Sequence, residues 1–424
     1  MKRILASLGI ATAMLTVGTA HVHAAPVTCK QILAKYPTGV AKNKASASRA
    51  VALGFARPAI DAKAHASARR FDTFRDGTAC VTEANKRAAL PGLAAAASTS
   101  TTDALVSGHP LVTTALTSAL ANAGATCMVA MRDGKIIGEW YWAGRTPTTR
   151  TIGYSTTKPL VGAVVGAAVQ LGRLTLDQPV ADFVPEWKGT PKGAITIRHF
   201  LTHRSGLKST NVDLQTAFFT SSGASTRTAL SLPLVSTPGS TWDYDSSSVS
   251  MQVLVRVIER AVGEKFATFA EKYVLRPAGM TNTSFKGDDP AAGWDAGDPW
   301  MAGGANTTCR DLARLGQMYH QKGQWAGQQV FSSAYATEAS SVQVTDATTQ
   351  VAGTYGLLLN QNWGGIGHGG ACGQMLLTMP SGVTIASMST STRPDDSVRN
   401  PALCALPRLA ALTQATLAVA RLSL

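Results

Sequence analysis

Two copies of the S-x-x-K motif have residue types and spacing that suit covalent catalysis: Ser155 with Lys158, and Ser205 with Lys208. On a helix, a serine and a lysine at this spacing lie one turn apart on the same face, so the amine can accept the hydroxyl proton. The activated hydroxyl then attacks a carbonyl carbon and forms an acyl-enzyme. The alternative is a serine that caps a helix beside a solvated lysine, which has the same spacing. The flanking sequence has to distinguish the two copies.

The sequence after the first copy predicts a buried helix. Residues 160–169 (LVGAVVGAAV) are small or apolar throughout, which is typical of a helix buried on all sides. The positive N-terminal end of such a helix would stabilise an alkoxide at Ser155, and burial would disfavour the charged form of Lys158. Pro159 is tolerated only in the first turn. Ser205, in contrast, is followed by glycine and a turn-rich stretch, so we expect no helix there.

The segment around Ser155 is one of six ordered segments that resemble the serine β-lactamase-related superfamily. They are most similar to the branch of class C β-lactamases, family VIII carboxylesterases and 6-aminohexanoate-dimer hydrolases. The resemblance extends from about residue 108 to 421, and it implies an α/β (α+β) fold of the β-lactamase/transpeptidase type and a serine hydrolase without metal or cofactor. The six segments are residues 154–158, 174–180, 195–207, 238–246, 276–280 and 310–316.

The resemblance implies roles for three side chains. Ser155 stands at the position of the family's nucleophile, and Lys158 at that of its partner in activation. Tyr244 falls on the tyrosine of the family's Y-x-N motif, whose phenol relays protons between nucleophile and leaving group. Tyr244 also ends a Pro-Gly loop and opens a helix-length run at residues 247–262, so the alternative is a tyrosine whose ring caps that run. Whether Lys158 or Tyr244 is the base in acylation stays open at this point.

His368, Gly369 and Gly370 stand where the lactamases carry K-T-G, directly before a predicted strand. Glycines at such a position let a strand edge approach a substrate acyl group. The resemblance implies an oxyanion hole formed by the backbone N–H groups of Ser155 and Ala371. The alternative for His368 is a loop histidine whose hydrogen bonds are satisfied within the protein.

Two positions depart from the class C β-lactamase pattern. Ser246 replaces the asparagine of Y-x-N, and His368 replaces the lysine of K-T-G. The lactamases use those two side chains to hold the amide and the carboxylate of the drug, so the departures favour small esters or linear amides as substrates. The alternatives are a β-lactamase or D-peptidase that acts on cell-wall peptides, and a catalytically silent protein that binds an envelope polymer.

Predicted strands at both ends of this region enclose a helical middle. An Asp-Gly pair at residues 133–134, between two β-rich runs, is a hairpin signal. We expect one antiparallel sheet flanked by helices, with a helical domain inserted at roughly residues 175–350 and the site in the cleft between them. The predicted strands are residues 126–130, 136–142, 355–359, 374–379 and 383–388, and the predicted closing helix is residues 403–419.

The N-terminus has the pattern of a secretory signal peptide. Lys2 and Arg3 precede an apolar stretch at residues 4–17 and a run of small residues. This pattern predicts a signal peptide at residues 1–24, with cleavage after Ala24 and a secreted or periplasmic protein.

A basic, Ala-rich extension at residues 25–107 precedes the predicted hydrolase domain at residues 108–424. We expect short helices at residues 26–92. The chain has a formal charge of +14, and residues 26–108 hold twelve Lys or Arg against five Asp or Glu. This excess favours a solvated basic face, with weak association to an anionic envelope surface as the alternative. Nucleic acid is not expected as a partner, because the protein is predicted to be exported.

The six cysteines of the chain predict disulfide bonds. They form no C-x-x-C pair and do not cluster with histidine at the spacing of a zinc site, and no H-E-x-x-H motif is present. We therefore expect no metal centre, and we expect an oxidising compartment. The predicted pairs are Cys29 with Cys80, Cys127 with Cys404, and Cys309 with Cys372.

Overall fold

A computed structural model describes most of the chain after residue 108. The described residues are 109–210, 213, 224–285, 298–347, 353–361, 363–389 and 406–422, together with scattered residues between 31 and 79.

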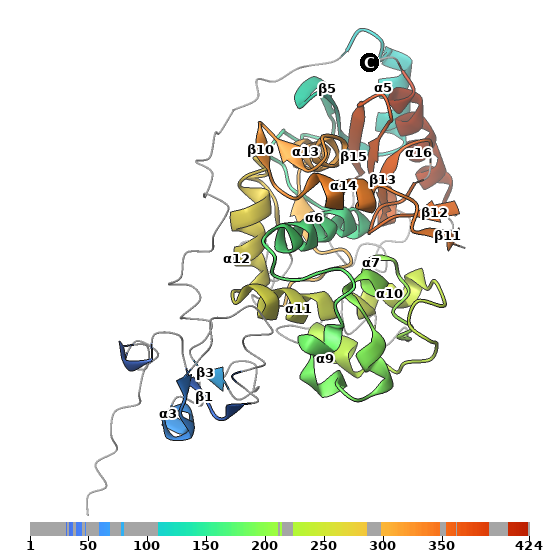
Figure 1. Cartoon of the computed structure of the whole chain (residues 1–424). Coiled ribbons are helices and arrows are strands. Elements are labelled where there is room, and N and C mark those ends of the chain that lie inside the picture. The colour runs from blue at the N-terminus through green and yellow to red at the C-terminus, as the bar shows by residue number, and fades with distance from the viewer. Residues whose placement is uncertain are drawn as a thin grey trace, which may run out of the picture.

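The central element is a five-stranded antiparallel sheet with the strand order β13-β14-β15-β4-β5. Strands from the two ends of the hydrolase region lie side by side in it, since Met128 on β4 is paired with Ser387 on β15 (Figure 1). Asp133 and Gly134 both have positive φ and form the hairpin turn between β4 and β5, as their sequence predicts. The strands are β4 (Ala125–Arg132), β5 (Lys135–Tyr141), β13 (Ile366–Gly370), β14 (Gln374–Thr378) and β15 (Thr384–Ser389).

Alternate residues of each central strand enter two different hydrophobic cores, because successive side chains of a strand point to opposite faces. On β4, Met128 and Ala130 belong to the core shared with helices α5 (Thr114–Asn122) and α16 (Leu406–Ala420). Val129 and Met131 belong to the other core, which includes helices α6 (Thr157–Gln170) and α13 (Cys309–His320). Both faces of the sheet are therefore covered by helices, and α6 lies on the face toward the helical middle (Figure 1).

The helical middle confirms the predicted succession of helices between the two sets of strands. The run predicted at residues 247–262 forms two helices, α10 (Tyr244–Ser250) and α11 (Val253–Val262), which are separated at Met251 and Gln252. In the described part of the chain, no helix combines the length and apolar character needed to cross a membrane. The remaining helices of this region are α7 (Ile197–Leu201), α9 (Ala224–Ser231), α12 (Phe266–Ala270) and α14 (Ser333–Ala339), and a small sheet joins β6 (Thr151–Ile152), β8 (Ala305–Thr307) and β7 (Ser284–Phe285).

The strand predicted at residues 355–359 is wrong for all but its first residue. Strand β12 (Gly353–Tyr355) pairs with β11 (Val344–Ala347) in a separate two-stranded sheet. The chain then turns: the N–H groups of Leu357 and Leu358 donate to the carbonyls of Ala339 and Leu201, the last residues of two helices. Helix ends leave carbonyls without intrahelical partners, and this apolar run supplies donors to them instead of pairing as a strand.

The described residues before 109 contain more than the short helices that we expected there. Three short strands, β1 (Val40–Ala41), β2 (Ala59–Ile60) and β3 (Thr78–Ala79), form a sheet in the order β2-β1-β3, and α3 (Ala62–Ser67) follows β2. The predicted signal peptide lies outside the described residues.

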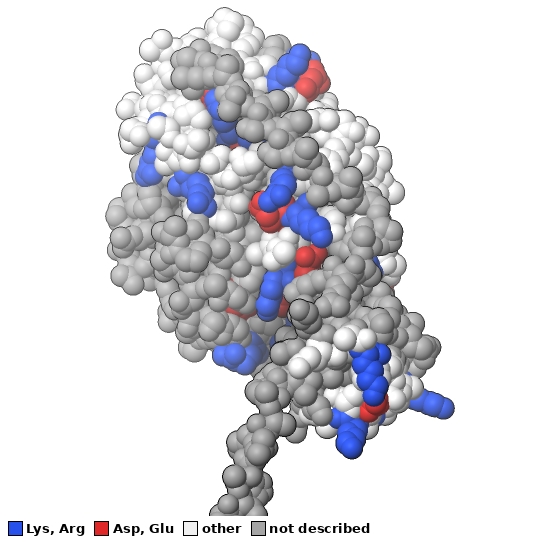
Figure 2. All heavy atoms as spheres, turned by 90° about the vertical axis from the view of Figure 1, so that its left-hand side faces the viewer, with Lys and Arg blue, Asp and Glu red and all other residues white. Residues whose placement is uncertain are grey.

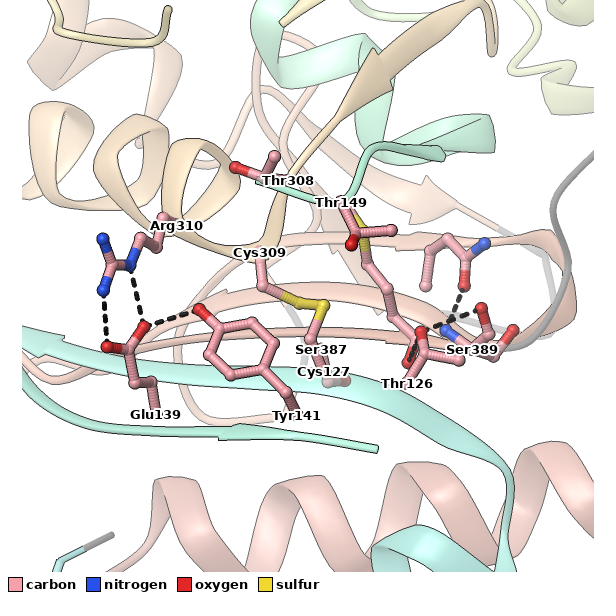
Figure 3. The surroundings of a disulfide bond; sticks show 12 residues. Thr126, Cys127, Glu139, Tyr141, Thr149, Thr308, Cys309, Arg310, Ser387 and Ser389 are labelled. Atoms are coloured by element: carbon pink, nitrogen blue, oxygen red, sulfur yellow. Dashed lines mark hydrogen bonds and ion pairs between the residues drawn. A yellow bond between two sulfur atoms is a disulfide. The ribbon is translucent and has the colours of Figure 1, made fainter. Parts of the chain in front are cut away.

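The predicted disulfide pairing is wrong for Cys127 and Cys309, which are bonded to each other across 182 residues of sequence. The bond joins β4 to the first residue of α13, and the bidentate ion pair of Arg310 with Glu139 lies beside it (Figure 3). The hydroxyl of Tyr141 also donates to Glu139. Sequence spacing gave no indication that α13 packs on β4.

Of the two other predicted disulfides, one is wrong and one is not tested. Because Cys309 is bonded to Cys127, its predicted pairing with Cys372 is also wrong, although Cys372 is itself in a disulfide. The predicted bond between Cys29 and Cys80 lies outside the described residues.

Candidate active site

Ser155 lies in a single 3-10 turn (Tyr154–Thr156) that leads directly into α6. The residue before it, Tyr154, has a φ of 46°, which is uncommon for a non-glycine residue and is typical of functional turns. Cys372, on the turn after β13, also has positive φ, and it packs against Tyr154 and Ile152. Apolar packing thus holds the strained turn and presents Ser155, which is only half-buried.

Lys158 lies one turn further on, where its Nζ is 2.8 Å from the Ser155 Oγ. Nζ also donates to the carbonyl oxygen of Ala302 at 3.0 Å. Lys158 is fully buried, and this burial lowers the pKa of its amine to about 7. The amine is therefore neutral in a large fraction of molecules near neutral pH, and it lies at hydrogen-bond distance from the hydroxyl.

The loop that carries Ala302 is held by a buried glutamine at the break between α10 and α11. Gln252 accepts from the N–H of Met301 at 3.0 Å and donates to the carbonyl of Pro299 at 2.7 Å. Further along the loop, the N–H of Ala305 donates to the Thr157 hydroxyl. We did not predict Gln252 or Ala302 from the sequence, because neither belongs to a motif and the contacts span more than 45 residues.

Tyr244 is the first residue of α10, and its ring faces the lysine. Lys158 Nζ lies 4.7 Å from the centroid of the Tyr244 ring. Burial raises the pKa of the Tyr244 phenol above its usual value, and its hydrogen bond with Ser155 acts in the opposite direction. Asp243 caps the helix by accepting from the N–H of Ser246, which fixes the start of α10. Because its pKa is raised, the Tyr244 phenol stays protonated beside Ser155 and Lys158.

The glycines of the predicted H-G-G segment are part of a strand, since β13 runs through His368 and ends at Gly370. A Cβ added to Gly370 would lie 2.5 Å from the carbonyl oxygen of Gly153 and 3.3 Å from the backbone nitrogen of Ser155. Only glycine permits β13 to approach the serine turn this closely. Ala371 follows at the exposed end of the strand, while Gly369 lies against Trp363.

His368 does not line an open surface. Its side chain is 1% exposed; Nδ1 lies 2.6 Å from the carbonyl oxygen of Gly369, and Nε2 lies 3.1 Å from the Tyr355 hydroxyl. Burial, followed by the charge of Lys158, lowers the pKa of its imidazole to about 3. The imidazole is therefore neutral, and its hydrogen bonds are made within the protein.

Ser246 also forms a hydrogen bond within the protein. Its hydroxyl accepts from the N–H of Ser209 at 3.2 Å, and the residue is 2% exposed. This contact ties α10 to the segment that contains the second S-x-x-K copy. As predicted, that copy is not on a helix, and Lys208 forms an ion pair with Asp243 at 2.9 Å.

Among the described residues, no group of three or more His, Cys, Asp and Glu side chains is arranged to hold a metal ion. The site that the structure brings together consists of a hydroxyl, a buried amine, a phenol and backbone N–H groups. Such a set is suited to acyl transfer, in which the serine attacks and the other groups move protons.

Comparison with known proteins identifies the family. The family model described as Beta-lactamase matches residues 113–405. Esterase EstB of Burkholderia gladioli is 34% identical over 155 residues, which cover 32% of this chain and 38% of that protein. The 6-aminohexanoate-dimer hydrolase of Paenarthrobacter ureafaciens is 27% identical over 219 residues, which cover 49% and 55%. The chain thus aligns with about half or less of the length of these curated relatives.

A solved structure with the same fold is a penicillin-binding protein homologue from Caulobacter crescentus. It superposes with a TM-score of 0.57 at 18% sequence identity, over 74% of this chain and 99% of that one. At this identity the likeness concerns the fold alone, and it confirms the expected β-lactamase/transpeptidase architecture. Because the family model covers well over half of the chain and includes Ser155, Lys158 and Tyr244, the protein belongs to the Beta-lactamase family of serine hydrolases.

Proposed function

We propose that the protein is an exported serine hydrolase that forms an acyl-enzyme on Ser155 and cleaves small esters or linear amides. The observation that carries the proposal is the 2.8 Å separation of the Lys158 Nζ from the Ser155 Oγ, combined with complete burial of the lysine. A buried amine with a pKa of about 7 is neutral in a large fraction of molecules near pH 7 and can then act as a base, and no metal or cofactor is needed for this chemistry.

In acylation, the Ser155 Oγ attacks the substrate carbonyl carbon while Lys158 takes the hydroxyl proton. The carbonyl oxygen becomes an oxyanion, which we assign to the backbone N–H groups of Ser155 and Ala371. The pKa directions support Lys158 as the base rather than Tyr244, because burial favours the neutral form of both groups. A neutral amine accepts a proton, whereas a neutral phenol must first lose one.

The proton then has to reach the leaving group. Tyr244 lies beside both Ser155 and Lys158, so its phenol can donate to the departing oxygen or nitrogen and recover a proton from the Lys158 ammonium. The bond between the carbonyl carbon and the leaving group breaks, and the acyl group remains on Ser155. Water then attacks the ester, the Ser155 oxygen recovers its proton, and the acid product leaves.

The substrate proposal rests on two side chains, His368 and Ser246, that form hydrogen bonds within the protein. His368 is neutral and buried, and the Ser246 hydroxyl accepts from the Ser209 N–H, so neither offers a charge to a substrate carboxylate. A neutral acyl group is compatible with such a site. The names of the relatives, an esterase and a 6-aminohexanoate-dimer hydrolase, agree with this substrate class.

Export is supported by the disulfide between Cys127 and Cys309, because disulfides persist mainly in oxidising compartments. We propose a periplasmic or secreted location on this basis and on the signal pattern at residues 1–24. On the face shown in Figure 2, the described Lys and Arg side chains are spread out, and several lie beside Asp or Glu. The described basic side chains thus form no continuous stripe on this face.

The first test is the intact mass of the protein after exposure to a fluorophosphonate probe, with peptide mapping of the adduct. We expect a single adduct on Ser155, none in Ser155→Ala, and labelling slowed by about 10²-fold or more in Lys158→Ala. The matched controls are Ser205→Ala and Lys208→Ala, which should label at the rate of the unmodified protein. A folded protein without an adduct would contradict the proposal and would favour a binding protein.

The second test is a panel of short-chain esters, linear amides, a chromogenic cephalosporin and D-Ala-D-Ala peptides. We expect turnover of esters or linear amides to exceed that of the cephalosporin. Rapid cephalosporin or peptide hydrolysis would instead establish a β-lactamase or D-peptidase, and would show that His368 and Ser246 do not exclude a carboxylate.

A further inference from the structure

A buried tyrosine joins two histidines behind the proposed proton relay. The Tyr355 hydroxyl lies 2.9 Å from the Nε2 of His203 and 3.1 Å from the Nε2 of His368. All three side chains are 1% exposed, and they come from three separate segments: the turn after α7, the end of β12, and β13. Because the three side chains are buried, each donor among them needs an acceptor.

The partners of these groups determine where each proton lies. The carbonyl of Gly369 can only accept, so the His368 Nδ1 that faces it at 2.6 Å must carry a proton. In a neutral imidazole the His368 Nε2 is then an acceptor, and Tyr355 donates its single proton to it. The Tyr355 oxygen in turn accepts, which leaves His203 Nε2 as the donor.

The remaining ring nitrogen of His203 agrees with this assignment. Within the described part of the chain, His203 Nδ1 is buried and has no hydrogen-bond partner. In the assigned tautomer this atom carries a lone pair and no proton. A buried lone pair without a donor is more often tolerated than a buried N–H without an acceptor.

Both imidazoles contact the ring of Tyr244. The His203 ring meets it edge-on with centroids 5.1 Å apart, and the His368 ring stacks on it at 6.0 Å with an interplanar angle of 25°. Trp242 adds a third contact at 5.8 Å. The Tyr244 ring, whose phenol is hydrogen-bonded to Ser155, thus packs against two imidazoles that share the Tyr355 hydroxyl.

We propose that Tyr355 is a positioning residue: by hydrogen-bonding both imidazoles, it holds His368 as the Nδ1–H tautomer and His203 as the Nε2–H tautomer, and these rings orient the Tyr244 phenol for proton transfer. The kinetic part of this inference rests on the proposed hydrolase function, whereas the tautomer assignment does not. The hydrogen bonds described for the two histidines go to Tyr355 and Gly369 and not to Ser155 or Lys158, so we assign their effect on the reaction to their contacts with Tyr244.

The neutrality of both rings follows from their surroundings. Burial is the largest cause that lowers the pKa of each imidazole, and the charge of Lys158 lowers both further. The carbonyl of Gly369 acts in the opposite direction on His368 but does not outweigh burial. Two neutral imidazoles of opposite tautomer are the combination that satisfies every donor in the hydrogen-bond network of His203, Tyr355 and His368.

The tautomers are measured by nitrogen NMR of the full-length protein labelled with ¹⁵N-histidine. We expect one ring protonated at Nδ1 and one protonated at Nε2 among the buried histidines, assigned with His368→Gln and His203→Gln. Finding His368 protonated at Nε2, or both rings protonated at the same nitrogen, would overturn the proposal. This readout needs no catalytic activity, so it remains decisive if the hydrolase proposal fails.

The kinetic test is Tyr355→Phe, which removes the hydroxyl and keeps the ring. We expect kcat for the best ester of the panel to fall by about 10- to 100-fold with KM changed by less than about twofold, since small misplacements of a reacting group have effects of this size. The matched control is Tyr335→Phe, which removes another buried hydroxyl, the donor to the Gly162 carbonyl at 2.6 Å. It should leave kcat unchanged.

Conservative variants separate positioning from general loss of structure. His203→Gln retains a donor near the Nε2 position and should retain most of the activity, whereas His203→Leu should resemble Tyr355→Phe. Unchanged kcat in folded Tyr355→Phe, or equal losses in Tyr335→Phe and Tyr355→Phe, would overturn the positioning role. If Tyr355→Phe does not fold, the comparison of His203→Gln with His203→Leu tests the positioning role instead, and equal kcat values in these two variants would overturn it.

Discussion

The two S-x-x-K copies of this chain have the same spacing and opposite surroundings. Lys158 is completely buried and lies 2.8 Å from Ser155, whereas the Lys208 side chain is 53% exposed and pairs with Asp243. Burial lowers the pKa of Lys158 to about 7, and the hydrogen bond to Asp243 raises the pKa of Lys208 above its usual value. Only one of the two copies thus has a buried amine beside its hydroxyl, which is the arrangement that the proposed base and nucleophile require.

The serines differ in the same way. The Ser155 hydroxyl lies on a strained turn next to a buried amine, while the Ser205 hydroxyl accepts from the N–H of Leu207 at 3.3 Å and stabilises a turn. The first environment favours loss of the hydroxyl proton, and the second uses the hydroxyl as an acceptor. The contrast can be tested at each of the four motif positions.

The largest effect is expected at the serines. Ser155→Ala should lower kcat/KM for the best substrate by about 10⁴-fold or more, because it removes the atom that forms the acyl-enzyme. Ser205→Ala should change it by less than about twofold. Steady-state kinetics on both variants measure the difference, and a large loss in Ser205→Ala alone would reverse the assignment of the two copies.

The pH dependence of kcat/KM should separate the lysines. Lys158 accepts a proton only when it is neutral, so kcat/KM should fall by about tenfold for each pH unit below about 7. Lys208→Ala should leave this acid limb in place, since the pKa of Lys208 is raised and the group stays charged throughout. An acid limb that disappears in Lys208→Ala would contradict the proposed role of Lys158.

Stability should depend on pH through Lys158 as well. Its pKa is about 7 in the folded protein and 10.5 in the unfolded chain, so unfolding takes up a proton between these values. The free energy of unfolding should therefore gain up to about 1.4 kcal/mol per pH unit from pH 7 to 10.5, and this contribution should be absent in Lys158→Met. Denaturant unfolding at several pH values measures the slope, and equal slopes in the two proteins would contradict burial of the amine.

A smaller effect is expected at Asp243, which caps α10 and binds Lys208. Asp243→Ala should cost about 1 kcal/mol of stability, since it removes the N-cap of the helix that begins with Tyr244. Asp243→Asn, which preserves an acceptor for the cap, should recover most of this loss. Thermal unfolding of the three proteins is the measurement, and an equal loss in Asp243→Asn would assign the effect to the ion pair instead.

The smallest effect is expected at Lys208. Its ion pair is exposed, so Lys208→Ala should change stability by less than about 0.5 kcal/mol and leave kcat unaltered. The same assays report this result. A loss above about 1 kcal/mol would show that the second copy has a structural role that its exposure does not indicate.

Much of the fold was predictable from local patterns. The Asp-Gly hairpin, the small-residue helix after Ser155 and the strands near residues 374–379 and 383–388 are all present. Each of these elements carries its own signal within about ten residues, through turn chemistry or side-chain periodicity. The strand predicted at residues 355–359 failed because apolar residues there pack between helix ends, and a run of leucines does not distinguish the two environments.

The residues of the candidate site also fall into two groups, those with a local sequence signal and those without one. Ser155, Lys158 and Tyr244 were predicted from motifs, and the structure brings all three together. Ala302, Gln252, His203 and Tyr355 were not predicted, because the contacts that give them a place at the site connect residues far apart in the sequence.

The sequence by itself determined the identity and spacing of the chemical groups and the family to which the chain belongs. Only the tertiary structure decided which loop carbonyl meets the Lys158 amine, which cysteines meet, and which histidines are held neutral behind Tyr244. The physical reason is that desolvation and hydrogen-bond matching depend on everything packed around a group, including segments more than a hundred residues away.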